Sequence, residues 1–307
     1  MGSDPIVVSD VCSGAMFPAP IAPEFPTEQA ATIQSQLRYE DCAQDGRMMP
    51  IALPPTMGGL WASVIRRHPG AQNALASGVI PILTRMTMVS FDQPIRIDRP
   101  VETRAGFLLA HDIDNGEMSR LFMNVWTDVH GIAGRIGPRQ VEGALSRAGT
   151  LFAEHTFTRL FAPPDQRKVT KLEALGYPVL PPTRYASPPP RTARDAPEGA
   201  TWLDELAPDT VDTVFTLDQT DANQHVNSLV YVRTFLDAAQ RRIAATGRSL
   251  KLRSKAVDIA YRKPCFAGER VTSQLRLFSL EDSIGAAGLM TGDDAKPRCF
   301  VRVMFGP

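Results

Sequence analysis

Cysteine is scarce and widely spaced in this sequence of 307 residues. The four cysteines, Cys12, Cys42, Cys265 and Cys299, form no C-x-x-C pair. Such spacing argues against a disulfide scaffold and against a zinc site, and it favours free thiols in a reducing compartment. We therefore expect a cytoplasmic protein that binds no metal and needs no cofactor.

Long apolar runs and an excess of charge are lacking as well. No stretch approaches the roughly 20 apolar residues of a membrane-spanning helix, and the N-terminus has no basic segment followed by an apolar core. The 33 Lys and Arg residues are balanced by 33 Asp and Glu residues, so the formal net charge is zero. We therefore expect no membrane span, no secretory signal and no nucleic-acid partner.

Proline, by contrast, is abundant in two segments that divide the chain. The first lies within residues 1–29, and the second reads "YPVLPPTRYASPPPRTARDAPEG" and ends at Gly199. Proline lacks an N–H and fixes φ, so neither segment can be a continuous helix or a central strand. We predict an extended arm (1–29), an N-terminal unit (30–175), a linker (176–200) and a C-terminal unit (201–307), which suits the length of the chain.

The two halves resemble each other in sequence. "LRYEDCAQDGRM" (Leu37–Met48) aligns with "FTLDQTDANQHV" (Phe215–Val226), and this alignment sets Arg47 against His225. Further on, "FDQPIRIDRPV" aligns with "YRKPCFAGERV", in the same order along the chain. A duplicated unit is the simplest explanation of two matches in one order.

Each half predicts the same succession of a short strand, a polar loop, one helix and several antiparallel strands. The second helix is expected from Ser228 to about Ala245, capped by Asn227 or Ser228 and ended by Gly247. Its apolar residues recur every three or four positions and form one stripe: Leu229, Val232, Phe235, Leu236, Ala239 and Ile243. The pattern predicts an α+β unit in which a sheet wraps the helix.

The residues around this helix resemble a known family. "DANQHVN" (Asp221–Asn227) is similar to the D-x-N-x-H-V-N signature of acyl-ACP thioesterases, and "YRKPC" falls where that family commonly has Y-R-R-E-C. Over about residues 30–307, the resemblance implies two fused hotdog units, each a curved antiparallel sheet wrapped around one long helix. Pro264 is a departure, because the family often has there a glutamate with a proposed catalytic role.

The residues of this motif suit thioester hydrolysis. Asp221 can act as general base or nucleophile, and the amide of Asn223 can orient the water or the thioester. His225 can donate to the oxyanion or shuttle a proton. In an extended loop, alternate side chains would point the same way. We expect the backbone N–H groups of Val226 and Asn227, at the helix start, to face the carbonyl oxygen of the thioester.

Three further residues are weaker candidates. A lone cysteine such as Cys265 is more often a buried residue that packs like a small apolar side chain than a nucleophile. Arg47 occupies the place of His225 in the first half, so one complete site is expected rather than two. Asp45 could supply the acid that a hotdog dehydratase pairs with a histidine.

The expected function is hydrolysis of an acyl-ACP or acyl-CoA thioester in fatty acid or polyketide metabolism. Two alternatives stay open. One is another acyl-thioester enzyme, a dehydratase or an acyltransferase, and the other is a protein that binds acyl carriers without catalysis. The sequence also leaves open whether the chain forms a homo-oligomer.

Overall fold

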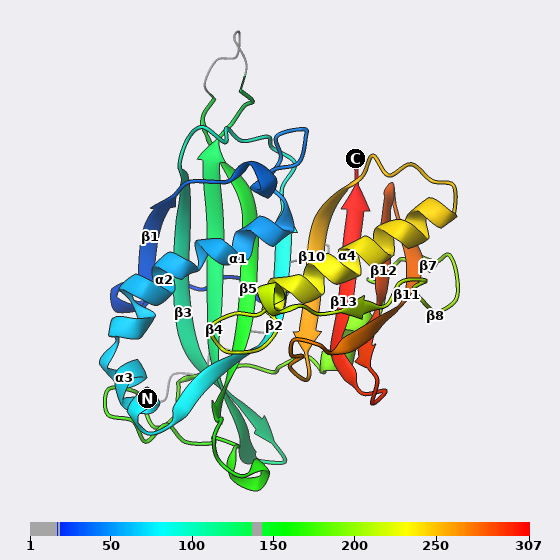
Figure 1. Cartoon of the computed structure of the whole chain (residues 1–307). Coiled ribbons are helices and arrows are strands. Elements are labelled where there is room, and N and C mark those ends of the chain that lie inside the picture. The colour runs from blue at the N-terminus through cyan, green and yellow to red at the C-terminus, as the bar shows by residue number, and fades with distance from the viewer. Residues whose placement is uncertain (1–16, 18, 137–142) are drawn as a thin grey trace. The chain divides into compact units, whose positions relative to one another are not determined.

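The computed structural model describes residues 17, 19–136 and 143–307 (Figure 1). The chain divides into two compact units. Unit 1 comprises residues 1–48, 52–84 and 91–188, and unit 2 comprises residues 49–51, 85–90 and 189–307. Most of the expected N-terminal arm, residues 1–16 and 18, lies outside the described residues.

Unit 1 is built on an antiparallel sheet of long strands. The order is β1 (Ala30–Ser35), β3 (Val101–Asp114), β4 (Glu117–Ile132), β5 (Leu145–Arg159) and β2 (Val79–Ser90), and the short β6 (Thr183–Arg184) pairs with β3. Asn115 and Gly116, both with positive φ, connect β3 to β4. An Asn-Gly pair is the preferred two-residue hairpin turn, so this connection is encoded locally.

The single long helix predicted for the first half is wrong. Unit 1 instead has three short helices: α1 (Leu53–Thr56), α2 (Gly58–Ser63) and α3 (Pro69–Ala76). Prolines and glycines begin or interrupt each of them, and both residue types disfavour a helix interior. Figure 1 shows the three pieces following one another along the same face of the unit 1 sheet. The remaining turns of the chain are 3-10: η1 (Thr27–Gln29), η2 (Tyr39–Asp41), η3 (Pro50–Ala52), η4 (Ile65–Arg67), η5 (Pro164–Gln166), η6 (Pro190–Arg194) and η7 (Leu217–Gln219).

Unit 2 repeats the strand order of unit 1. Its sheet runs β11 (Arg270–Leu280), β12 (Ser283–Gly292), β13 (Pro297–Gly306) and β10 (Arg253–Tyr261), all antiparallel. Residues 85–90 of β2, assigned to this unit, lie beside β10 and pair with it through Arg85–Val89. The outer edge of β11 carries three two-residue strands: β7 (Thr201–Trp202), β8 (Ala207–Pro208) and β9 (Thr213–Val214). The shared order is what a duplicated sequence predicts.

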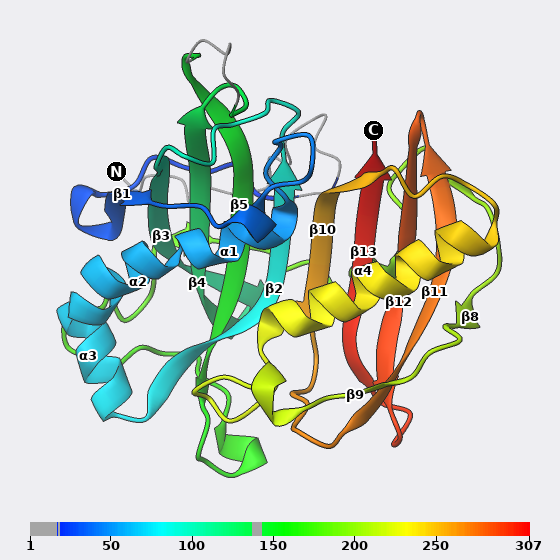
Figure 2. The same cartoon turned by 45° about the horizontal axis from the view of Figure 1, so that its top comes forward.

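Helix α4 (Ser228–Ala245) lies across the sheet of unit 2 (Figures 1 and 2). The predicted bounds are confirmed: the Asn227 side chain accepts a hydrogen bond from the Leu229 N–H at 3.0 Å, and Gly247 with φ +75° follows the helix end. Its buried face consists of Tyr231, Val232, Phe235, Ala238, Ala239 and Ile243. Among the described residues, no helix is long and apolar enough to cross a membrane.

The proline-rich segment after Gly176 packs along both units rather than hanging free. Up to Pro188 it belongs to unit 1, where the Tyr185 ring lies 5.2 Å from the Phe122 ring and the Tyr185 hydroxyl donates to Glu154. From Pro189 onward it belongs to unit 2, where η6 packs on β10, β12 and β13.

One carboxylate lies completely buried in the sheet of unit 2. Asp258 is 0% exposed, and its oxygens accept from Arg85 Nη2 at 2.6 Å, Arg302 Nη2 at 2.8 Å and Thr87 Oγ1 at 3.1 Å. Burial alone would raise the pKa of Asp258, but the guanidiniums of Arg85 and Arg302 hold it below its usual range. The group is therefore an ionised cluster, whose charges stabilise the fold only while they remain paired.

Candidate active site

The motif loop of unit 2 is a closed turn. An isolated bridge joins Thr220 to Val226, the Asp221 N–H donates to the His225 carbonyl at 3.1 Å, and the Gln224 N–H donates to the Asp221 carbonyl at 2.9 Å. Gln224 has φ +64°, in the left-handed region. The alternation of side chains considered for an extended loop therefore does not apply, because these bonds fold the backbone back on itself.

The carboxylate of Asp221 connects this loop to the start of α4. Oδ1 accepts the Asn223 N–H at 2.8 Å, and Oδ2 accepts from Nδ2 of Asn227 at 3.2 Å. Asn227 in turn caps α4 through Leu229. A carboxylate has about four acceptor positions, so Asp221 is held in place and can still accept a proton or a further hydrogen bond.

His225 is half-buried, and Asn223 is exposed in the turn beside it. The Nδ1 atom of His225 lies 3.3 Å from the carbonyl oxygen of Val226. A carbonyl only accepts, so this contact assigns the proton of neutral His225 to Nδ1 and leaves Nε2 as an acceptor. The ring is thereby better arranged to take a proton than to donate one to an oxyanion.

The expected oxyanion donors at the helix start are already engaged. The Val226 N–H donates to the Cys265 carbonyl at 2.8 Å, and the Asn227 N–H donates to the Gln219 carbonyl at 2.9 Å. The assignment of these two groups is therefore wrong. Within the described part of the chain, the Ser228 N–H has no hydrogen-bond partner. It is the first N–H of α4, and the first turn of a helix leaves such groups unpaired.

Cys265 lies fully buried under the loop. Its N–H donates to the hydroxyl of Tyr231 at 2.7 Å, and the hydroxyl of Tyr261 donates to the Ser228 carbonyl at 3.0 Å. Burial is the main cause that raises the pKa of the Cys265 thiol, and the nearby Glu269 carboxylate adds to it. A raised pKa keeps the sulfur as a poorly nucleophilic thiol, which suits a packing role.

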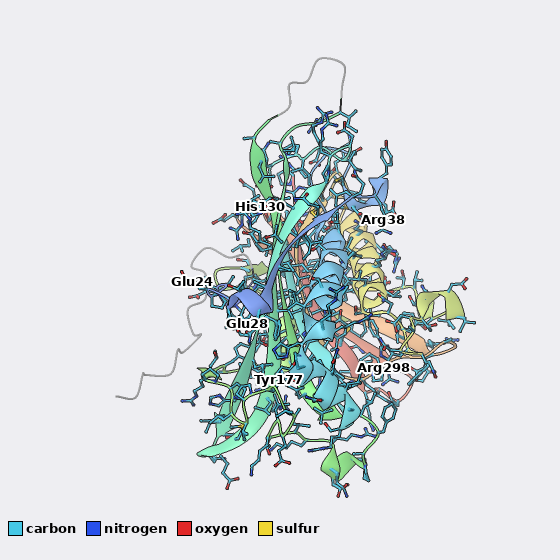
Figure 3. The ribbon with its side chains drawn as sticks, turned by 90° about the vertical axis from the view of Figure 1, so that its left-hand side faces the viewer. Glu24, Glu28, Arg38, His130, Tyr177 and Arg298 are labelled. Carbon is cyan, nitrogen blue, oxygen red and sulfur yellow. The ribbon has the colours of Figure 1, made fainter. Side chains whose placement is uncertain are left out.

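Glu269 and Arg298 adjoin Cys265 and were not singled out by any sequence pattern. Arg298, labelled in Figure 3, is the second residue of β13, and its Nη1 donates to Asp294 at 2.9 Å. The Nε of Arg298 lies 3.7 Å from Oε2 of Glu269, and neither of these buried atoms has a hydrogen-bond partner within the described residues. Glu269 directly precedes β11, and no sequence motif includes it or Arg298, so nothing in the sequence marked this pair.

Unit 1 contains the same loop. An isolated bridge joins Cys42 to Met48, the Ala43 N–H donates to the Arg47 carbonyl at 2.8 Å, and the Gly46 N–H donates to the Ala43 carbonyl at 2.9 Å. Gly46 has φ +82°. These are the bonds of the motif loop at the aligned positions, and a 3-10 turn precedes each loop. The sequence alignment of the two segments is therefore confirmed in their backbone geometry.

The two loops differ in their chemistry. Ala43 stands at the position of Asp221, so the unit 1 loop has no carboxylate there. Asp45 and Arg47 pair with each other, with Arg47 Nη1 3.2 Å from Asp45 Oδ2 and the Arg47 N–H 3.0 Å from Asp45 Oδ1. An acid, an amide and an imidazole occur together only in the loop of unit 2. Among the described residues, no group of three or more His, Cys, Asp or Glu could hold a metal ion.

Comparison with known proteins gives structural matches only. No protein-family model and no curated protein sequence matches the chain. A protein described as an oleoyl thioesterase from Lactobacillus plantarum superposes with a TM-score of 0.59 at 15% identity, covering 90% of this chain and 96% of the other. The fold of this chain is therefore similar to the fold of that protein.

Two further thioesterases support this likeness. An acyl-ACP thioesterase from Bacteroides thetaiotaomicron has a TM-score of 0.58 at 14% identity, covering 90% of this chain and 97% of its own. The 12:0-ACP thioesterase from Umbellularia californica has a TM-score of 0.55 at 11% identity, covering 91% of this chain and 97% of its own. The resemblance read from the sequence is confirmed at the level of the fold, over nearly the whole chain.

Proposed function

We propose that this chain hydrolyses an acyl thioester to a free acid and a thiol, and that its site is the motif loop of unit 2. We further propose that both units are hotdog units, fused into a double hotdog. The observation that carries the site assignment is the contrast between two loops of one backbone geometry. Only the loop with Asp221, Asn223 and His225 combines an acid, an amide and an imidazole.

The groups of this loop can perform each step of the hydrolysis. Asp221, held by two hydrogen bonds, accepts a proton from water as the water oxygen attacks the thioester carbonyl carbon. Asn223 orients the water or the thioester. The oxyanion receives the Ser228 N–H at the positive end of the α4 dipole, and one such donor contributes about 3–4 kcal/mol. Nε2 of His225 relays the proton to the leaving sulfur as the C–S bond breaks, which gives the acid and the thiol.

The likeness in fold supports the proposed substrate class. The solved structures that it resembles include two acyl-ACP thioesterases, which supports an acyl group on acyl carrier protein, and coenzyme A thioesters offer the same reacting bond. The mechanism assigns no role to a metal or a cofactor. A cytoplasmic location remains an expectation from the sequence.

A matched pair of variants tests the site assignment. His225→Ala removes the imidazole of the unit 2 loop, whereas Arg47→Ala removes the side chain at the same position of the unit 1 loop. We expect kcat for one acyl thioester to fall by about 100-fold in His225→Ala, the range for loss of an acid–base group. Arg47→Ala should stay within about threefold of the parent. Equal losses in the two folded variants would reject unit 2 as the site.

A non-catalytic acyl-carrier-binding protein is the second candidate. Pro264 supplies no carboxylate where the thioesterase family often has a glutamate, and the raised pKa of Cys265 leaves no thiolate beside it. Saturable binding of an acyl thioester without thiol release would favour this function. A dehydratase would instead remove water from a 3-hydroxyacyl thioester, and mass spectrometry would detect that loss.

A further inference from the structure

A concave basic site lies in unit 2, apart from the motif loop. It is a pocket of about 560 Å³, formed where η6 meets the end of β10 and the start of β13. Its lining contains four cations, Arg191, Arg262, Lys263 and Lys296, and no Asp or Glu. The rest of the lining is apolar and consists of three prolines and Phe300.

The charges of this pocket are mostly uncompensated. The ammonium of Lys263 lies 2.9 Å from Asp294. The other three cations form no ion pair within the part of the chain that the structure describes. Like charges gathered in a concavity repel one another and raise the local concentration of anions. The pocket is therefore suited to a ligand that carries several negative charges.

We propose that this pocket binds the phosphorylated adenosine end of coenzyme A, which carries a diphosphate and a 3′-phosphate. The proposal rests on the proposed thioester hydrolysis and deepens it by naming the carrier. The volume falls within the range of about 300–1,000 Å³ for small-molecule sites. Phe300 and the prolines offer apolar surface to the adenine, and the Arg194 guanidinium lies 6.0 Å from the Phe300 ring centroid.

The pocket and the motif loop share one stretch of chain. Lys263 lines the pocket, and Cys265 follows two residues later, within about 7 Å of chain. The Cys265 carbonyl accepts the Val226 N–H of the motif loop. The pocket lies on the η6 side of the sheet, whereas the Tyr261 hydroxyl contacts Ser228 of α4. The pantetheine arm, a flexible chain of many single bonds, would pass the end of β10 to reach the loop.

Calorimetric titration with adenosine 3′,5′-bisphosphate tests the pocket without any need for turnover. The full-length chain should bind this probe saturably, more tightly than inorganic phosphate and more weakly as salt increases. Arg191→Glu and Lys296→Glu, both at exposed side chains, should each weaken binding at least tenfold. Lys251→Glu, an exposed charge reversal outside the pocket, should bind like the parent. No saturable binding, or equal affinity in the pocket variants, would overturn the proposal.

Kinetics separate the failure of this pocket from the failure of the proposed function. In the pocket variants, KM for an acyl-CoA should rise at least tenfold, while hydrolysis of the matching acyl-pantetheine, which lacks the nucleotide, should be unchanged. Hydrolysis of acyl-CoA without bisphosphate binding would reject the pocket and keep the function. If the chain bound the bisphosphate but hydrolysed no thioester, and the pocket variants lost that binding, the pocket would be kept and the function rejected. A rise in KM confined to acyl carrier protein substrates would make this face a protein-docking surface and overturn the nucleotide site.

Discussion

Replacing Asp221 by Asn separates the catalytic role of this side chain from its structural role. In the parent, the carboxylate accepts from the Asn223 N–H and from the side-chain amide of Asn227. An Asn at position 221 can keep the first bond through its oxygen. Its NH₂ group would then face the NH₂ group of Asn227, and two donors cannot pair. Either this link is lost, or Asn227 rotates and gives up its cap on Leu229.

The structural cost of Asp221→Asn should be modest. Loss of one hydrogen bond or one cap costs about 1 kcal/mol, which lowers Tm by a few degrees. The catalytic cost should be larger. Removal of a positioned base lowers kcat by about 100-fold or more, and 100-fold corresponds to about 2.7 kcal/mol in the barrier. The two effects therefore differ in size and are measured separately.

Asn227→Ala is the matched control for this experiment. It removes the same link and the helix cap, at a similar cost of about 1 kcal/mol in stability, but it leaves the Asp221 carboxylate in place. Thiol release from one acyl thioester, followed well below Tm, should fall about 100-fold in Asp221→Asn and less than tenfold in Asn227→Ala. Equal losses would mean that Asp221 only shapes the loop. An Asp221→Asn variant as active as the parent would remove it from the mechanism.

Three further predictions concern buried side chains. Cys265→Ser should keep kcat within about threefold of the parent, because a thiol of raised pKa is not the nucleophile, and a folded but inactive variant would contradict this. Asp258→Asn should lower the free energy of unfolding in urea by about 3–5 kcal/mol, because it leaves two buried arginines without their carboxylate, and a loss below 1 kcal/mol would refute that pairing. Burial lowers the pKa of His155 to about 4, so the unfolded chain takes up a proton at a higher pH than the folded chain does. The contribution of neutral His155 to stability is complete above about pH 6.5 and is lost as the pH falls towards 4. Because of His155, the free energy of unfolding should fall by about 2 kcal/mol between pH 6.5 and 5. If the free energy of unfolding of His155→Leu fell equally steeply over this range, His155 would be excluded as the source.

The elements that the sequence predicted are those encoded by local patterns. Helix α4 carries its own apolar stripe, an Asn cap and a closing glycine, so its bounds could be read directly. The repeated loop was also detectable, because chemically similar residues occupy several aligned positions around Arg47 and His225, and a second match follows in the same order. The broken helix of unit 1 was missed even though its cause, the prolines and glycines from Leu53 to Gly70, stands in the sequence.

The features that could not be predicted depend on tertiary contacts. Gln224 adopts a left-handed φ that its residue type does not signal, so the sequence does not predict the closed turn of the loop. The N–H of Val226 is engaged by the carbonyl of Cys265, which lies 39 positions along the chain. That pairing moved the candidate oxyanion donor to Ser228. The Glu269–Arg298 pair likewise forms only when the ends of two strands meet.

Thiol release from a panel of acyl thioesters is the decisive measurement of thioester hydrolysis. Purified full-length chain is mixed with acyl-CoA and acyl carrier protein substrates of several chain lengths, and a thiol reagent reports each cleavage. We predict release of one thiol and one free acid for each molecule cleaved from at least one substrate, at a rate that falls about 100-fold in Asp221→Asn. Saturable binding without thiol release across the whole panel would contradict hydrolysis and leave an acyl-carrier-binding protein.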